Sequence, residues 1–115
     1  MEQTMVNRHF ANFHIAGFGY WEGCLMFQAL KVGTKLRLVR EAENRFDPYA
    51  VAIYFKETKL GYVPRENNAL ICQLVDLGYR DIFDVRVQRL SPDAHPEKQV
   101  GVVVFINSAN CVFNK

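Results

Sequence analysis

Short segments in which apolar and polar residues alternate are the feature that most limits how this chain can fold. Two-residue alternation places every second side chain on the same face of a β-strand. The pattern recurs in six segments that are separated by turn residues, namely 11–16, 34–40, 49–55, 59–63, 81–90 and 100–106. Between the last two, Pro92 and Pro96 lie among charged residues, which is typical of a long solvated hairpin loop. The sequence therefore predicts a mainly β fold of five or six short strands.

The segment 66–77 departs from this alternation and has helical spacing instead. Its apolar face is predicted from Ala69, Leu70, Leu74 and Leu77, with Ile71 and Val75 beside them. Glu66 or Asn67 can start this helix, and Gly78 stands where a C-terminal cap belongs. A shorter helical turn is predicted within 23–30. Short strands with one inserted helix indicate a small β-barrel, either of the oligonucleotide-binding (OB) type or SH3-like.

The chain has 115 residues, of which half are hydrophobic, and this suits one domain with a folded core over about 10–107. We expect 1–8 to be a lead-in and 107–115 a tail. No apolar run approaches the roughly 20 residues of a membrane span, and the N-terminus lacks a signal-peptide pattern. These features indicate an intracellular, cytoplasmic protein, with association with the nucleoid left open.

Three widely spaced cysteines, Cys24, Cys72 and Cys111, are interpreted as reduced thiols.

The sequence offers no recognisable catalytic or metal-binding set. His9, His14 and His95 lie far apart and lack the spacing of metal ligands. Asp47 with Arg65 could imitate a catalytic couple, but no motif places a nucleophile beside them. We therefore predict a protein that is not an enzyme and that needs no cofactor or metal. Its net charge of +2 allows a nucleic-acid site only where basic residues cluster locally.

The most unusual stretch is 40–51, which joins two predicted strands. Asn44, Asp47 and Pro48 mark a tight turn. One interpretation is a purely structural turn closed by the Asn side chain. The other is that Asn44, Phe46 and Asp47 project from a rigid turn as an amide, an aromatic plate and a carboxylate that recognise a ligand.

In the stretch 60–66, a strand runs directly into a helix start, with Arg65 at the junction. The first turn of a helix presents free amides and a positive dipole end, and a guanidinium there adds a forked cation. The stretch could thus hold a phosphate, or Arg65 could be an ordinary exposed residue.

The stretch 15–23 is rich in glycine and aromatic residues. Its glycines allow the backbone to approach a ligand closely, and Tyr20 and Trp21 offer flat surfaces on which bases can stack. The alternative is a strand connection whose aromatic side chains cover the core.

In this order, the three stretches resemble the HIRAN domain. The matching motifs read Ala16-Gly-Phe-Gly-Tyr20, Leu38-Val-Arg-Glu-Ala-Glu-Asn-Arg-Phe-Asp-Pro-Tyr-Ala-Val51 and Leu60-Gly-Tyr-Val-Pro-Arg65, and the resemblance covers about 12–106. It implies a modified OB-like barrel of about six strands with one or two helices. It also implies a role in DNA repair and binding of a single-stranded DNA 3′ end, as in the best-understood members. The family occurs in the N-terminal part of certain fork-remodelling, helicase-like translocases and as small stand-alone or fused bacterial proteins.

Carried over by position, the resemblance assigns roles to individual residues. Tyr20 and Phe46 would clasp the terminal base, and Asp47 would accept a hydrogen bond from the 3′-hydroxyl. Asn44 would contact the terminal nucleotide, while Tyr62 and Arg65 would line the backbone path, with Arg65 on a phosphate. Secondary candidates are Gly17, Phe18, Gly19, Arg40 and Arg45.

The chain also departs from the family pattern. Gly19 occupies a position where DNA-end-binding members have an arginine that looks like a phosphate contact, so the grip on the DNA backbone is expected to be weaker. Four basic residues could compensate or could be plain solvated surface: Lys35, Arg37, Arg40 and Arg45. DNA is favoured over RNA, and a helicase or nuclease is a candidate partner. A module that binds peptides in the same groove is the alternative function.

Overall fold

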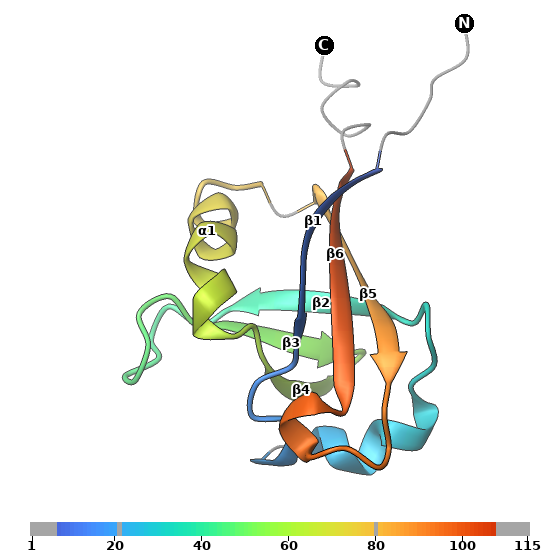
Figure 1. Ribbon diagram of the computed structural model, residues 1–115. Coiled ribbons are helices and arrows are strands. Elements are labelled where there is room, and N and C mark those ends of the chain that lie inside the picture. The colour runs from blue at the N-terminus through green and yellow to red at the C-terminus, as the bar shows by residue number, and fades with distance from the viewer. Residues whose placement is uncertain (1–6, 21, 80, 108–115) are drawn as a thin grey trace, which may run out of the picture.

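The computed structural model of the chain describes residues 7–20, 22–79 and 81–107 (Figure 1). Six antiparallel strands form one sheet in the order β1-β6-β5-β2-β3-β4. Figure 1 shows β1, β6 and β5 running steeply across β2, β3 and β4, so that the two halves of the sheet face each other. The strands are β1 Asn7–His14, β2 Lys35–Arg40, β3 Val51–Phe55, β4 Thr58–Tyr62, β5 Phe83–Leu90 and β6 Val100–Asn107.

The two edges of this sheet meet just after β1. The backbone N–H of Ala16 donates to the carbonyl of Tyr62, and the N–H of Tyr62 donates to the carbonyl of Ala16, both at 2.9 Å. Gly61 makes this approach possible, because a Cβ at that position would lie 2.4 Å from the carbonyl oxygen of Ala16. The sheet is thereby closed into a small barrel. The prediction of a mainly β, OB-like fold is confirmed.

The interior of the barrel is filled by the alternating apolar residues of the strands. Val85 and Val87 on β5 are almost completely buried, as are Val100, Val102 and Val104 on β6. Burial of each such side chain contributes about 1.5–3 kcal/mol relative to its exposure. The predicted inward face is confirmed for these five valines, whereas Phe83 and Ile106 are half-buried. In β6 both faces are buried from Val100 to Val104.

Helix α1, Arg65–Asp76, confirms the predicted helix and its end. Gly78 has φ of 98°, its N–H donates to Val75, and the next N–H donates to Leu74, as in a Schellman cap. The predicted apolar face was right for Ile71 and Val75 but wrong for its centre, of which only Leu74 is even half-buried. The buried positions are Asn68, Ile71, Cys72 and Val75, whereas Ala69, Leu70 and Leu77 are exposed. The buried face of α1 includes the polar residue Asn68. Apolar spacing alone therefore favours the neighbouring leucines.

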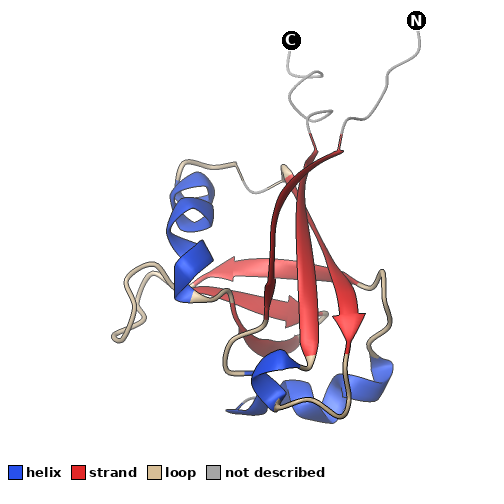
Figure 2. Cartoon of the chain, in the orientation of Figure 1, coloured by secondary structure: helices blue, strands red, loops and turns tan. Residues whose placement is uncertain are grey.

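Some boundaries also differ from the predictions. β1 begins at Asn7 rather than in the segment 11–16, because Asn7 pairs with Asn107 at the far end of β6. α1 begins at Arg65, after Pro64, and no side chain caps it. The predicted helical turn at 23–30 is a 3₁₀ helix, η2 Glu22–Ala29. Two further 3₁₀ helices, η1 Phe18–Tyr20 and η3 Pro96–Lys98, lie near η2 at one end of the molecule (Figure 2).

The side chains of three residues named in the sequence cannot be placed in the fold. Trp21 and Cys111 lie outside the described residues, as do most of the predicted lead-in and tail, and nothing is described of the side chain of Cys24. Within the described part of the chain, no helix is long and apolar enough to span a membrane.

Candidate nucleic-acid interface

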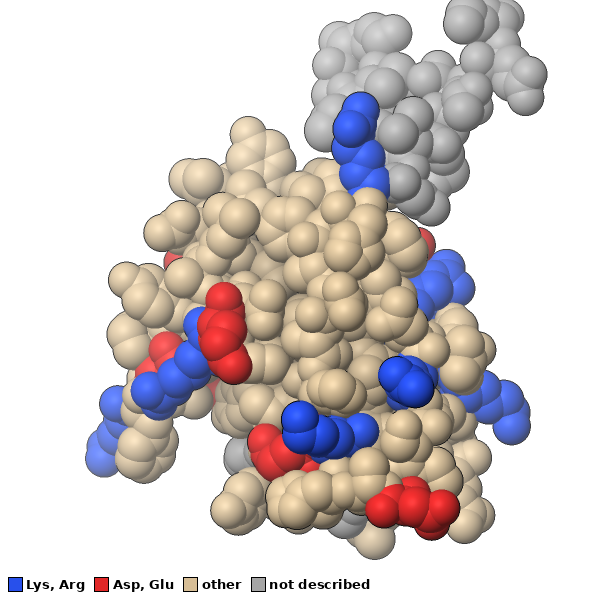
Figure 3. Space-filling view, in the orientation of Figure 1, with Lys and Arg blue, Asp and Glu red and all other residues tan. Residues whose placement is uncertain are grey.

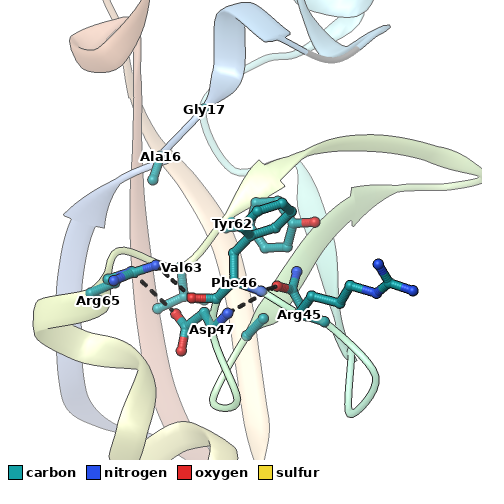
Figure 4. Close-up of a pocket in the computed structure, with 10 residues that line it drawn as sticks. Ala16, Gly17, Arg45, Phe46, Asp47, Tyr62, Val63 and Arg65 are labelled. Atoms are coloured by element: carbon teal, nitrogen blue, oxygen red, sulfur yellow. Dashed lines mark hydrogen bonds and ion pairs between the residues drawn. The ribbon is translucent and has the colours of Figure 1, made fainter.

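A pocket of about 440 Å³ opens beside the seam where the barrel closes (Figure 4). All three stretches singled out in the sequence contribute to its wall, although they are far apart along the chain. Its volume is in the range of small-molecule and nucleotide sites. The lining residues are Ala16, Gly17, Asn44, Arg45, Phe46, Asp47, Ala50, Tyr62, Val63 and Arg65.

Asn44 organises the turn that forms one wall of the pocket. Its Oδ1 accepts hydrogen bonds from the backbone N–H of Phe46 at 2.8 Å and of Asp47 at 3.0 Å. Its Nδ2 donates to Oε1 of Glu41 at 3.1 Å. The structure thus shows the structural turn that was one of the two interpretations of Asn44. The Asn44 amide fixes the shape of the turn, and this shape sets the directions of the Phe46 and Asp47 side chains.

The Asp47 carboxylate lies at the base of this turn, and its side chain is 17% exposed. Oδ1 accepts from the N–H of Tyr49 at 2.9 Å, and Oδ2 accepts from Nδ2 of Asn68 at 2.8 Å. Asn68 is itself buried in α1, so the carboxylate is anchored to the helix. A carboxylate can accept about four hydrogen bonds. These contacts therefore fix the position of Asp47 and still leave acceptor capacity.

Phe46 and Arg65 are two strongly exposed groups of the pocket wall. The Phe46 residue is 86% exposed, and the Arg65 side chain is 73% exposed. Arg65 Nη2 donates to the carbonyl of Phe46 at 2.9 Å, and its Nε lies 3.6 Å from Oδ2 of Asp47. Figure 4 shows Arg65 directed toward Asp47, whereas Arg45 extends to the opposite side of the turn. Arg65 is therefore oriented by two contacts while its other N–H groups remain available.

Tyr62 contributes its ring to the pocket and its hydroxyl to a polar network behind it. The hydroxyl donates to Glu41 Oε1 at 2.8 Å and accepts from Lys59 Nζ at 2.8 Å, and Lys59 also forms an ion pair with Glu41. Burial raises the pKa of Glu41, but hydrogen bonds from Lys59, Tyr62 and Asn44 outweigh burial and hold it below its ordinary value. Burial is the main cause that raises the pKa of Tyr62. The network keeps Glu41 charged and Tyr62 neutral.

Sequence reasoning did not single out Glu41, Lys59 or Asn68 as parts of the site. Glu41 lies in the 38–51 motif, three residues before Asn44, so that motif held a signal for it. Asn68 gave a fainter signal, as a polar residue on the apolar face of a helix. For Lys59 we find no signal in the sequence, because its role depends on the pairing of β3 with β4.

Tyr20 does not line this pocket. It is 87% exposed and lies in an adjoining hollow of about 550 Å³ that shares Gly17 with the pocket. The other lining residues of that hollow are Gly19, His95, Pro96 and Glu97. The backbone N–H of Gly17 donates to Oε2 of Glu97 at 3.0 Å, and this bond joins the two hollows. The candidate aromatic plates therefore stand in neighbouring hollows.

Two of the secondary candidates are engaged inside the protein. Phe18 is completely buried and packs edge-on against Phe27, with ring centroids 6.2 Å apart, so it is a core residue. Arg40 binds Asp76 through Nε at 3.0 Å and donates to two backbone carbonyls of the 41–50 turn. Arg40 therefore ties the turn to α1 and is not available to a phosphate.

The remaining basic candidates lie at the surface. Arg45 is exposed and lines the pocket. Lys35 and Arg37 are exposed near the start of β2, at the end of the strand away from the 41–50 turn. Figure 3 shows basic and acidic side chains spread over the visible face rather than one continuous basic field. At the pocket itself, Arg45 and Arg65 are the lining residues that could attract a polyanion.

Among the residues that the structure describes, no group of three or more His, Cys, Asp or Glu side chains is arranged to hold a metal ion. The described lining of the pocket also contains no His, Cys or Ser.

Comparisons with known proteins agree on the fold. A crystal structure of a protein from Lactobacillus plantarum is 22% identical, with a TM-score of 0.75 over 90% of this chain and 98% of that chain. The crystal structure of the HIRAN domain of human HLTF is 13% identical, with a TM-score of 0.69 over 94% of this chain and 86% of that one. No curated protein matches.

At these identities the two structures show a shared fold alone, and the family assignment comes from the sequence. The HIRAN domain family matches residues 9–108, which include all six strands up to Asn107 except the first two residues of β1. The resemblance inferred from the three motifs is thereby confirmed. The chain belongs to the HIRAN domain family, which is known generally as a family of DNA-binding modules.

Proposed function

We propose that this chain is a non-catalytic module that binds the 3′-hydroxyl end of single-stranded DNA in the pocket beside the barrel seam. The observation that carries the proposal is the meeting of three groups in that pocket: the exposed ring of Phe46, the anchored carboxylate of Asp47 and the exposed guanidinium of Arg65. A ring can stack on a base, a carboxylate can accept a hydroxyl proton, and a guanidinium can pair with a phosphate.

Asp47 is the group that would select the chemistry of the end. Because the N–H of Tyr49 and the amide of Asn68 hold it, the carboxylate cannot swing away from an approaching ligand. A 3′-hydroxyl would use the remaining acceptor capacity. A 3′-phosphate would instead place like charges together and lose affinity. Asp47 thus favours an unmodified 3′ end.

Tyr20 supplies the second aromatic surface of the proposal. Its ring is as exposed as that of Phe46, and the two hollows are joined at Gly17. Stacking of a base on either ring is worth about 1–3 kcal/mol. In this proposal Asn44 acts by holding the turn, Tyr62 lines the backbone path, and Arg45 assists Arg65 with phosphates.

The non-catalytic part of the proposal rests on which residues accompany Asp47 and Arg65. No nucleophile or histidine stands beside them in the described lining of the pocket. We further propose an intracellular role in DNA repair beside a helicase or nuclease, since such enzymes generate or act on free 3′ ends.

One observation favours peptide binding as a second candidate. Glu97 places a carboxylate in the hollow beside the pocket, where it would repel a phosphate and attract a lysine or arginine side chain. The two candidates differ in their response to salt, because phosphate contacts weaken steeply as salt is added.

The proposal is tested by fluorescence anisotropy with a single-stranded DNA labelled at its 5′ end, ending in either a 3′-hydroxyl or a 3′-phosphate. We expect tighter and salt-sensitive binding of the hydroxyl end. Asp47→Asn keeps the size of the side chain, removes its charge, and should lower the preference for the hydroxyl end roughly tenfold, or about 1.4 kcal/mol.

Asp84→Asn on β5 is the matched control for the loss of one negative charge, and it should leave the preference unchanged. Equal preference in the wild type and Asp47→Asn would remove Asp47 from its assigned role. Absence of binding to either DNA, together with binding of a basic peptide, would replace the proposal by the second candidate.

A further inference from the structure

The hollow around Tyr20 holds an unusual combination of groups for a surface that meets DNA. It joins an exposed aromatic ring, a proline and a carboxylate, contributed by Tyr20, Pro96 and Glu97. We propose that this hollow holds a nucleobase next to the pocket and selects bases that carry an exocyclic amino group, with Glu97 as the specificity-determining residue. The inference rests on the proposed function, since it names a preference of the same site.

The charge of Glu97 decides which part of a nucleotide can enter. A carboxylate repels a phosphate at close range, so the sugar-phosphate backbone is kept out of this hollow. The exposed cations of the site, Arg45 and Arg65, line the neighbouring pocket instead. The backbone is therefore expected on the side of the arginines, and a base on the side of Glu97.

The Glu97 carboxylate is exposed, and one hydrogen bond orients it while leaving acceptor capacity. Its Oε2 accepts from the N–H of Gly17 at 3.0 Å, and within the described residues this is its hydrogen-bond partner. His95 caps η3 through Nδ1, which accepts from the N–H of Glu97 at 3.1 Å and so sets the start of that short helix. Since a carboxylate accepts about four hydrogen bonds, Glu97 can accept further donors.

The bases differ in the exocyclic group that they can turn toward such a carboxylate. Cytosine and adenine carry an exocyclic amino group on their pairing edge, whereas thymine presents a carbonyl oxygen at the corresponding position. A carbonyl oxygen facing Glu97 would be repelled. Tyr20 would stack on any base, so discrimination must come from the carboxylate.

Gly19 keeps the hollow open. A Cβ at this position would lie 3.2 Å from Cβ of Pro96, so a longer side chain would crowd the space between Tyr20 and η3. The basic residue expected here from the family pattern would therefore compete with a base for the same space. Glycine at position 19, in place of a basic residue, thus removes a contact to the DNA backbone and at the same time leaves a hollow that could hold a base.

The test compares binding of oligo-dC, oligo-dA and oligo-dT of equal length with 3′-hydroxyl ends. We expect dC and dA to bind about fivefold more tightly than dT, the lower end of the discrimination that a side-chain contact to a base edge provides. Glu97→Gln keeps an acceptor for the N–H of Gly17 while adding a donor, and it should abolish this preference.

Asp93→Asn, in the same loop, is the matched control and should retain the preference. Gly19→Arg should also remove the preference while steepening the salt dependence by about one phosphate contact. Binding of all three DNAs with equal affinity would overturn the inference and leave the proposed function intact. Failure of all three to bind would overturn both.

Discussion

The 41–50 turn and the η1 segment each hold one aromatic ring out into solvent, but they are supported in opposite ways. Phe46 stands on a polar frame, in which Arg40, Asn44 and Asp47 direct their side chains to backbone groups of the turn. Tyr20 stands beside a hydrophobic anchor, Phe18, which is completely buried. Hydrogen bonds fix orientation, whereas apolar burial supplies stability. Damage to the first support should therefore cost less stability than damage to the second, and should act mainly on the shape of the turn.

The hydrophobic support should give the largest effect. Phe18→Ala removes a completely buried ring and leaves a cavity next to Phe27, so the free energy of unfolding should fall by about 3–5 kcal/mol. Urea denaturation followed by circular dichroism measures this loss. Tyr20→Ala, two residues along, removes an exposed ring and should change stability by less than about 0.5 kcal/mol. Similar losses in both variants would contradict the contrast between the two regions.

Removing the strongest member of the polar frame should come next. Arg40→Met keeps the aliphatic stem but leaves Asp76 and the carbonyls of Pro48 and Ala50 without their donors. We expect a loss of about 1.5–3 kcal/mol in the free energy of unfolding, since these hydrogen bonds come from a charged group. Arg45→Met on the same turn is the control, with little change expected because Arg45 is exposed. Equal stability of the two variants would show that Arg40 does not hold the turn.

A single link within the frame should have a smaller and more local effect. Asn44→Ala removes the acceptor for the N–H groups of Phe46 and Asp47, at a cost of about 1 kcal/mol in stability. Because the turn then loses its fixed shape, the affinity for a DNA 3′ end should fall further than the stability does. Parallel denaturation and anisotropy measurements separate the two quantities. An unchanged affinity would mean that the order of the turn is irrelevant to binding.

The smallest effect concerns pH. The pKa of Glu41 is lowered from 4.5 in the folded chain, so ionised Glu41 favours the folded state above pH 4.5 and this contribution is lost as the pH falls through the lowered pKa. On the alkaline side, the pKa of Lys59 is raised from 10.5, so its contribution is lost only as the pH rises through the raised pKa. Glu41→Gln should flatten the acid part of a stability profile measured by thermal unfolding. A profile with the same acid slope in both proteins would contradict this.

The sequence predicted the strands and the turn well because their signals are local. Alternation in β5 and β6 and the turn residues around Asn44 depend on near neighbours. The errors arose where distant contacts decide. The face of α1 depends on Asn68 meeting Asp47 across the fold, and the burial of Phe18 depends on η2. Two partners of Arg40 are backbone carbonyls. Every residue has such a carbonyl, so the sequence cannot indicate which ones Arg40 binds.

The seam between Ala16 and Tyr62 has a consequence for how the pocket comes into being. Both strands of the seam contribute to the pocket wall, so the pocket exists only while the seam is closed. A ligand that touches both sides links them across the barrel. It stabilises the closed form by a free energy that grows with the logarithm of its concentration over its dissociation constant. Amide hydrogen exchange at Ala16 and Tyr62, whose N–H groups are already hydrogen-bonded to each other's carbonyls across the seam, should therefore slow on binding. Because of the seam, hydrogen exchange of backbone amides can report whether the pocket is occupied.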